Sequence, residues 1–276
     1  MIKTKDILLA GLLGAALSTS FNAKAEEAAA PVAAAAEPES PHSFSSNIGL
    51  FSDYVFRGIS YGKERGAVQG GFDYAHANGF YLGLWATSVH QDTLYGNTVE
   101  LDIYGGYVHE FNEDWNLNVG FLQFYYPNNK KFERQSANTT ELSAALTYKY
   151  LTLKHSVAVT DFFGFNSKSL GAVGYNENGD TKGSGYTELN FNYPLNVLGG
   201  LNLALHVGHQ TVKNYSTFNY TDYLIGINKD FSVAGSEGWN AGINYTDTNA
   251  DDDDWVTGDG FETGDSKVTV YLKRTF

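Results

Sequence analysis

The sequence predicts an all-β protein, a closed antiparallel transmembrane β-barrel of about twelve strands with short periplasmic turns and long extracellular loops. Three observations predict it: segments in which apolar and polar residues alternate, connections that are alternately short and long, and a two-faced strand, Lys267–Phe276, at the C-terminus. Successive strand side chains point to opposite faces, so Val268 and Val270 share one face of that strand while Lys267 and Thr269 share the other.

Residues 1–25 are predicted to be a secretory signal peptide, because basic residues precede an apolar run and Ala23-Lys24-Ala25 forms a small-x-small cleavage site. The apolar run is too short to cross a bilayer as a helix, which takes roughly 20 residues. Residues 26–43 are rich in Ala, Glu and Pro and contain little that could be buried, so we expect a flexible lead-in. The barrel is then expected over residues 44–276.

Alternating segments near the length of a tilted membrane strand follow one another along the chain. Alternation alone also fits a soluble sandwich or a lipocalin-like barrel whose apolar face turns inward. The connections favour the membrane barrel, because those after even-numbered segments are short and those after odd-numbered segments are mostly longer and more polar. The predicted strands are residues 47–57, 67–75, 80–87, 99–107, 115–121, 141–149, 152–160, 188–193, 201–210, 222–228, 239–246 and 267–276.

Several stretches resemble a known family. Residues 47–60 (NIGLFSDYVFRGIS), 67–74 (AVQGGFDY) and 100–107 (ELDIYGGY), with the Thr275-Phe276 ending, resemble the TorF-like porin family of proteobacteria. The resemblance implies a Gram-negative outer-membrane barrel that is exported through the periplasm, inserted by the barrel assembly machinery, and surrounded by outer-membrane lipids and lipopolysaccharide. Arg274 departs from the pattern, because such barrels usually carry an apolar or aromatic residue two positions before the terminal Phe. Either it weakens recognition by the assembly machinery or it snorkels at the periplasmic interface.

A barrel of this size encloses more space than inward apolar side chains could fill, so a polar lumen is expected. The function predicted for it is passive passage of small solutes or ions, with a weak preference for cations because inward acidic residues outnumber basic ones. The alternative is a non-conducting barrel, filled by internal salt bridges, with a structural or surface-binding role. The candidate pore-lining residues are Asp53, Arg57, Asp73, Glu100, Asp102, Glu141, Lys149, Lys154 and Glu188.

The acidic loop at residues 247–265 offers carboxylates that could coordinate Ca²⁺. Its spacing matches neither an EF-hand loop nor a glycine-rich calcium repeat, so a solvated loop that exchanges divalent cations with surface lipopolysaccharide is the favoured interpretation. We therefore predict no resident metal and no cofactor. The weak candidate ligands are Asp251, Asp252, Asp253, Asp254 and Asp259.

Composition argues against several other functions. The net charge of −13 opposes general nucleic-acid binding, and the absence of Cys excludes disulfides and thiolate sites. A lipid-hydrolysing barrel would need a serine beside an outward histidine such as His209, and the sequence shows no such pair and no Gly-x-Ser-x-Gly motif. The chain is accordingly predicted to have no enzymatic activity. Nothing in the sequence marks a subunit interface.

Overall fold

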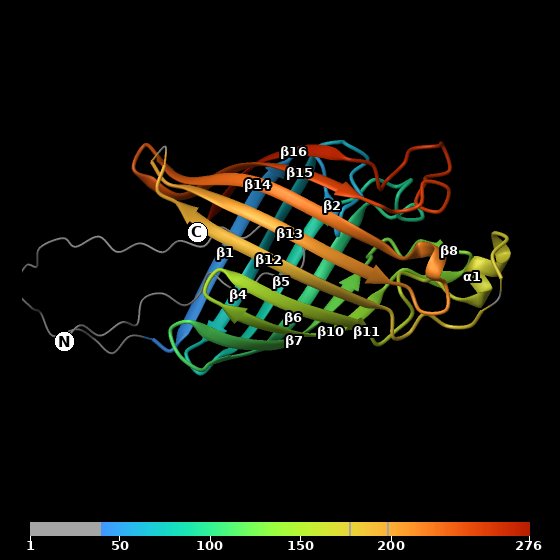
Figure 1. Cartoon of the computed structure of the whole chain (residues 1–276), viewed down its shortest axis with the longest axis horizontal. Coiled ribbons are helices and arrows are strands. Elements are labelled where there is room, and N and C mark those ends of the chain that lie inside the picture. Colours follow the sequence, from blue (N-terminus) through green and yellow to red (C-terminus); the bar gives the residue numbers. More distant parts are fainter. Residues whose placement is uncertain (1–39, 177, 198) are drawn as a thin grey trace, which may run out of the picture.

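The computed structural model describes residues 40–176, 178–197 and 199–276, so the predicted signal peptide and residues 26–39 of the predicted lead-in lie outside the described residues. Within them the chain forms a closed barrel of twelve antiparallel strands (Figure 1), which confirms the predicted fold. No helix in the described part of the chain is long and apolar enough to cross a membrane. The barrel strands are β1 (His42–Phe51), β4 (Ala67–His76), β5 (Phe80–Ser88), β6 (Val99–Glu110), β7 (Trp115–Tyr125), β10 (Thr139–Tyr148), β11 (Leu151–Ala158), β12 (Gly185–Leu195), β13 (Leu201–Thr211), β14 (Tyr220–Val233), β15 (Ser236–Thr248) and β16 (Lys267–Thr275).

The ring closes because β1 pairs with β16 on one side and with β4 on the other. Short turns connect the strands at the end where β1 begins and β16 ends (Figure 1). The β14–β15 turn, for example, consists of Ala234 and Gly235, with φ of 49° and 79°, as a two-residue type I′ hairpin requires. The predicted alternation of short and long connections is confirmed. The longer connections, all at the opposite end, are residues 52–66, 89–98, 126–138, 159–184, 212–219 and 249–266.

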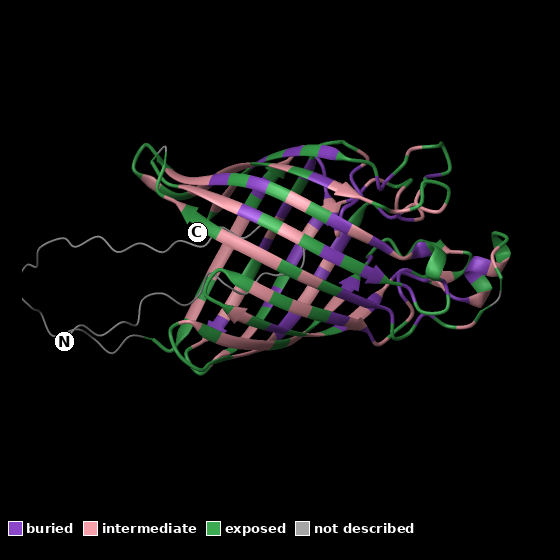
Figure 2. Ribbon diagram, viewed as in Figure 1, coloured by how far each residue is buried: buried purple, intermediate pink, exposed green. Residues whose placement is uncertain are grey.

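The outer wall of the barrel is apolar. Leu142 on β10 is 48% exposed and has Phe121 and Val157, both apolar, as its partners on the neighbouring strands. Exposed and less exposed residues alternate along the strands in Figure 2, and the inward positions carry most of the polar residues. A sandwich or an apolar-filled barrel would bury these side chains, so the wall fits a lipid environment instead.

Because the outer wall is apolar, a charged residue placed on it should destabilise the barrel in lipid. We expect Leu142→Arg to lower the free energy of unfolding in lipid vesicles by about 2–4 kcal/mol, because an arginine on the lipid face near the bilayer midplane carries that cost. The matched variant Ser143→Arg places the same side chain one residue further, where it faces the lumen, and should change stability much less. Denaturant titration of both refolded proteins measures the difference. Equal losses would contradict a lipid-facing wall.

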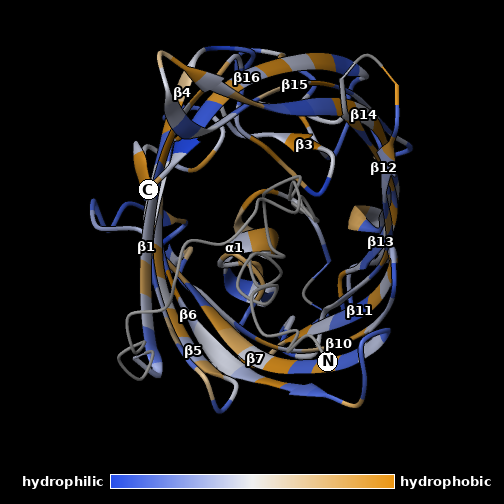
Figure 3. Cartoon of the chain, turned by 90° about the vertical axis from the view of Figure 1, so that its left-hand side faces the viewer, coloured by the Kyte–Doolittle hydropathy of each residue, from blue (hydrophilic) through white to orange (hydrophobic). Residues whose placement is uncertain are grey.

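The first predicted strand, residues 47–57, is wrong at its C-terminal end. β1 stops at Phe51, and residues 52–66, here called the lumen hairpin, turn into the barrel. Their two short strands, β2 (Val55–Phe56) and β3 (Ile59–Ser60), are joined at Arg57 and Gly58, whose φ of 49° and 80° define a type I′ turn. β3 lies inside the ring of strands when the barrel is viewed from the end where β1 begins and β16 ends (Figure 3).

Apolar side chains from the longer connections fill the mouth of the barrel around this hairpin. Phe56 packs against Phe124 with ring centres 5.4 Å apart, and Phe124 packs against Phe163 at 5.1 Å. The loops before β14 and β16 meet through Phe218 and Trp255. We call the buried set the mouth cluster, and its side chains pack together at this end of the barrel. Its principal members are Tyr54, Phe56, Ile59, Tyr61, Leu94, Phe124, Tyr126, Phe162, Phe163, Leu170, Tyr215 and Phe218.

Candidate functional site

The lumen hairpin places the side chain of Arg57 against the far wall of the barrel. The guanidinium donates to Glu141 on β10 through Nη1 (2.9 Å) and Nη2 (2.7 Å), and to Oε1 of Gln210 on β13 (3.1 Å). Its central carbon lies 4.2 Å from the centre of the Tyr186 ring on β12. In the ring of strands, β10 and β13 lie five and four positions from β1 in opposite directions, so the hairpin crosses the lumen.

The Arg57–Glu141 ion pair is almost completely shielded from solvent. The side chains of Arg57 and Glu141 are 6% and 5% exposed. A bidentate arginine–carboxylate pair is among the strongest polar contacts in proteins, and removing one partner of such a buried pair leaves the other charge uncompensated. The pair therefore contributes to holding the hairpin in the lumen.

The wall behind the Tyr186 ring carries a polar network of its own. The Tyr186 hydroxyl donates to Oδ1 of Asp222 (2.8 Å), and Oδ2 of Asp222 lies 2.8 Å from Nε2 of His206. Glu188 on the same wall pairs with Lys154 (3.3 Å). These contacts join β11, β12, β13 and β14 without involving the hairpin, so the wall is fixed independently of it.

Inward carboxylates on β6 face the other side of the hairpin. Glu100 accepts hydrogen bonds from the hydroxyls of Tyr54 (2.5 Å) and Tyr126 (2.6 Å), which ties the hairpin to the loop after β7. Asp102, two residues along the strand, is 3% exposed, and within the described residues its Oδ1 accepts no hydrogen bond. The hairpin is thus held by polar contacts on both sides of the lumen.

Asp53 lies where the hairpin leaves β1. Its Oδ2 accepts a hydrogen bond from Ser60 (2.7 Å), which links the two arms of the hairpin. Burial raises the pKa of Asp53 to about 6, although the Ser60 hydrogen bond and the charge of Lys267 act in the opposite direction. Lys267, the first residue of β16, donates to the carbonyl oxygens of Gly58 (3.0 Å) and Thr263 (3.1 Å), so the hairpin tip is also fixed to the barrel wall.

This raised pKa predicts that the hairpin docks more firmly in acid. Docking favours the protonated form of Asp53, so the stabilisation is complete below pH 4 and is lost as the pH rises through about 6. We expect the undocked fraction of the hairpin, measured by chemical labelling of a hairpin residue, to increase between pH 4.5 and 7.5. Asp53→Asn should flatten this dependence. If Asp53→Asn shows the same pH profile as the natural protein, the pH dependence belongs to another titratable group.

The structure places most of the predicted lining residues inside the barrel, although not always as predicted. Asp53 and Arg57 lie in the lumen on the hairpin rather than on a strand. Lys149 requires correction, because it lies in the β10–β11 turn and pairs with Asp114 of the neighbouring turn (3.4 Å), at the rim. Whether any of them selects ions stays a prediction. The inward wall residues among the candidates are Asp73, Glu100, Asp102, Glu141, Lys154 and Glu188.

Sequence reasoning missed the residues that complete the Arg57 site. Alternation places Gln210 and Lys267 on inward faces, but it does not show that both contact one hairpin. Tyr186 lies next to the predicted strand 188–193, and β12 begins at Gly185 instead. A longer predicted strand would have put the Tyr186 ring on the same face as Glu188, so the alternation could have predicted its inward position.

The five carboxylates predicted as weak cation ligands do not gather at one point. Asp259 pairs with Lys63 of the lumen hairpin, and Asp254 accepts hydrogen bonds from the hydroxyls of Tyr175 and Thr217. The Oδ1 of Asp251 accepts a hydrogen bond from the backbone N–H of Asp253 (3.0 Å). These acids therefore link loops or stabilise their own turn.

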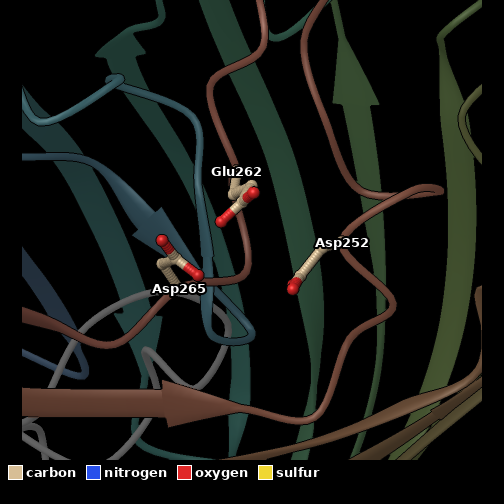
Figure 4. Close-up of side chains that lie close together, drawn as sticks. All are labelled: Asp252, Glu262 and Asp265. Atoms are coloured by element: carbon tan, nitrogen blue, oxygen red, sulfur yellow. The ribbon is translucent and has the colours of Figure 1, made fainter.

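Asp252 instead approaches Glu262 and Asp265, and one carboxylate oxygen from each lies within 4.8 Å of the others (Figure 4). All three side chains are exposed, and exposed acidic groups often gather in this way without an ion. Repulsion from Asp265 and Asp252 raises the pKa of Glu262. Divalent-cation binding by this loop stays a prediction.

The closed ring, the apolar outer wall and the polar lumen define a transmembrane β-barrel of the outer-membrane type. Residues 35–276 match the family described as "Bacterial protein of unknown function (Gcw_chp)", and the chain belongs to this family. No curated protein matches the chain.

Similar solved structures include outer-membrane porins. A KdgM porin in complex with disordered oligogalacturonate is 10% identical, with 84% of this chain and 98% of that chain covered and a TM-score of 0.49. A NanC porin is 10% identical, with coverages of 85% and 99% and a TM-score of 0.44. OprD from Pseudomonas aeruginosa is 14% identical, with coverages of 77% and 61% and a TM-score of 0.37. At such identities the likeness concerns the fold alone.

Proposed function

We propose that this protein is a porin of the bacterial outer membrane that allows passive passage of small solutes or ions, and that the lumen hairpin closes it in the conformation described. The supporting observation is the Arg57–Glu141 pair, through which a single loop crosses a polar lumen and docks on the opposite wall. A loop of this kind can undock without disturbing the strands, because Phe51 and Ala67 pair directly across its base.

A preference for cations is part of this proposal. Inward acids such as Asp102, Glu100 and Asp222 outnumber the basic residues that pair with them, and fixed charge of one sign in a narrow pore favours ions of the other. The resemblance to TorF-like porins, insertion by the barrel assembly machinery, and contact with lipopolysaccharide and outer-membrane lipids belong to the same proposal.

The test is recording of the purified, folded protein in planar bilayers. We expect brief openings from a predominantly closed state, and a reversal potential of the sign for cations in a salt gradient. If neither the natural protein nor a variant without the hairpin gives discrete steps, the porin function is overturned.

The second candidate function is a non-conducting barrel that serves envelope structure or surface binding. The mouth cluster favours it, because side chains from many loops pack into one buried core that an open channel would have to disrupt. The same recordings separate the two functions, since this candidate predicts silence in every variant that keeps the barrel folded.

A further inference from the structure

We infer that Glu141, Gln210 and Tyr186 form a binding site for a small organic cation bearing a guanidinium group, and that Arg57 occupies this site from within the chain when the hairpin is docked. This inference adds a class of ligand to the proposed porin. Only the passage of that ligand through the barrel rests on the proposed function. Binding itself is a property of the wall.

The contacts match the shape of a guanidinium and not merely its charge. Glu141 receives two parallel N–H bonds, at 2.9 and 2.7 Å, which requires a planar fork of donors. Gln210 accepts a third, and the central carbon of the guanidinium lies over the Tyr186 ring, which adds cation–π attraction. A primary ammonium could use the charge of Glu141 and the Tyr186 ring but could not form the planar fork of two parallel hydrogen bonds.

The wall orients two of the three groups, Gln210 and Tyr186, without help from the hairpin. The Nε2 of Gln210 donates to the carbonyl oxygens of Gly185 and Thr211, both at 3.1 Å, so the amide is oriented with Oε1 directed at Arg57. Asp222 fixes the Tyr186 hydroxyl. Preorganised groups bind a ligand with less ordering cost, so the Gln210 amide and the Tyr186 ring stay in position for a guanidinium when the hairpin leaves.

The hairpin also has anchors that do not involve Arg57. Tyr54 binds Glu100, and Lys267 holds the carbonyl of Gly58 at the tip. An external guanidinium therefore competes with one contact of a hairpin held by several. Its binding and the undocked state favour each other, because the tip cannot return fully to an occupied site.

The variant Arg57→Asn tests the inference. The residue has φ of 49°, and Asn-Gly is the preferred pair for a type I′ turn, so the hairpin keeps its backbone while the site loses its internal cation. We expect millimolar methylguanidinium to raise the thermal unfolding midpoint of Arg57→Asn in detergent, while methylammonium at equal ionic strength does so much less. The natural protein, whose site is filled, should respond little.

The double variant Arg57→Asn/Glu141→Gln is the matched control. It should bind methylguanidinium at least about tenfold more weakly than Arg57→Asn, since it lacks the charge-assisted fork. If Arg57→Asn does not fold, Arg57→Lys retains the charge and should be displaced more easily than the natural residue, which calorimetric titration with methylguanidinium would show.

The outcomes separate this inference from the porin function. Equal responses to methylguanidinium and methylammonium, or equal affinities in the single and double variants, overturn the site and make the Arg57–Glu141 pair a structural salt bridge only. Selective binding without conductance in any variant supports the site and overturns the porin. Conductance that methylguanidinium changes in Arg57→Asn but not in the double variant supports both.

Discussion

Replacing residues 52–66 by Asn-Gly is expected to convert a mostly closed barrel into one that conducts continuously. Phe51 and Ala67 are directly paired, so a two-residue type I′ turn can join β1 to β4 in the existing register. The replacement removes Arg57 from the lumen together with Tyr54, Phe56 and Ile59 of the mouth cluster. The paired residues of β1 with β4 and with β16 are all kept, and the barrel should fold.

The size of the effect follows from the docking free energy. If the hairpin is held by about 3 kcal/mol, the low end for a buried ion pair, the open fraction of the natural protein is about 1%. Permanent removal of the hairpin should then raise the mean conductance by roughly two orders of magnitude. Planar-bilayer recording at equal protein density measures this directly.

The matched control shortens a loop that does not cross the lumen. Ser88 and Val99 are paired across the base of residues 89–98, so the same Asn-Gly replacement fits there. This variant loses part of the mouth cluster but keeps the Arg57 contacts, and we expect it to stay closed most of the time. Equal conductance in the two variants would mean that the loops close the mouth together and that the hairpin has no special part.

The strand pattern could be predicted because lipid imposes it. Each barrel strand must present apolar residues outward at every second position, as Leu142, Ala144 and Leu146 do on β10. The lumen hairpin escaped prediction because Tyr54 and Phe56 continue the parity of Ile48 and Leu50. The alternation of apolar and polar residues does not distinguish a strand that stays in the wall from one that folds into the lumen, because a buried hairpin also has two faces.

Which residues of each strand face inward was predictable, but the residues that their side chains contact were not. Glu141 has the correct parity for the lumen, yet its partner is 84 residues away in the sequence, on a loop. No local pattern encodes such a contact. The predicted pore-lining position of Lys149 was wrong for a different reason. Lys149 has a positive φ of 53° and belongs to a turn, where the alternation of strand faces no longer applies.

Breaking the Arg57–Glu141 pair is expected to release the hairpin while leaving the barrel intact. Glu141→Gln removes the carboxylate and leaves a buried guanidinium with only Gln210 and the aromatic faces, which should cost about 3–5 kcal/mol of docking free energy. The chain has no cysteine, so Ile59→Cys, at a hairpin position that is 2% exposed, provides a specific reporter of undocking. Its labelling by a maleimide should be up to about a hundredfold faster in the Glu141→Gln background.

The double variant Arg57→Asn/Glu141→Gln decides whether the two residues act as one unit. Once both charges are removed, position 141 no longer faces a buried guanidinium without a counter-charge, so labelling should be slower than in Glu141→Gln alone. The hairpin then depends on Tyr54, Lys267 and its apolar contacts, which the single and double variants at Arg57 and Glu141 share. If the effects of the single substitutions simply add, Arg57 and Glu141 stabilise the docked hairpin independently, and their pairing does not hold the lumen closed.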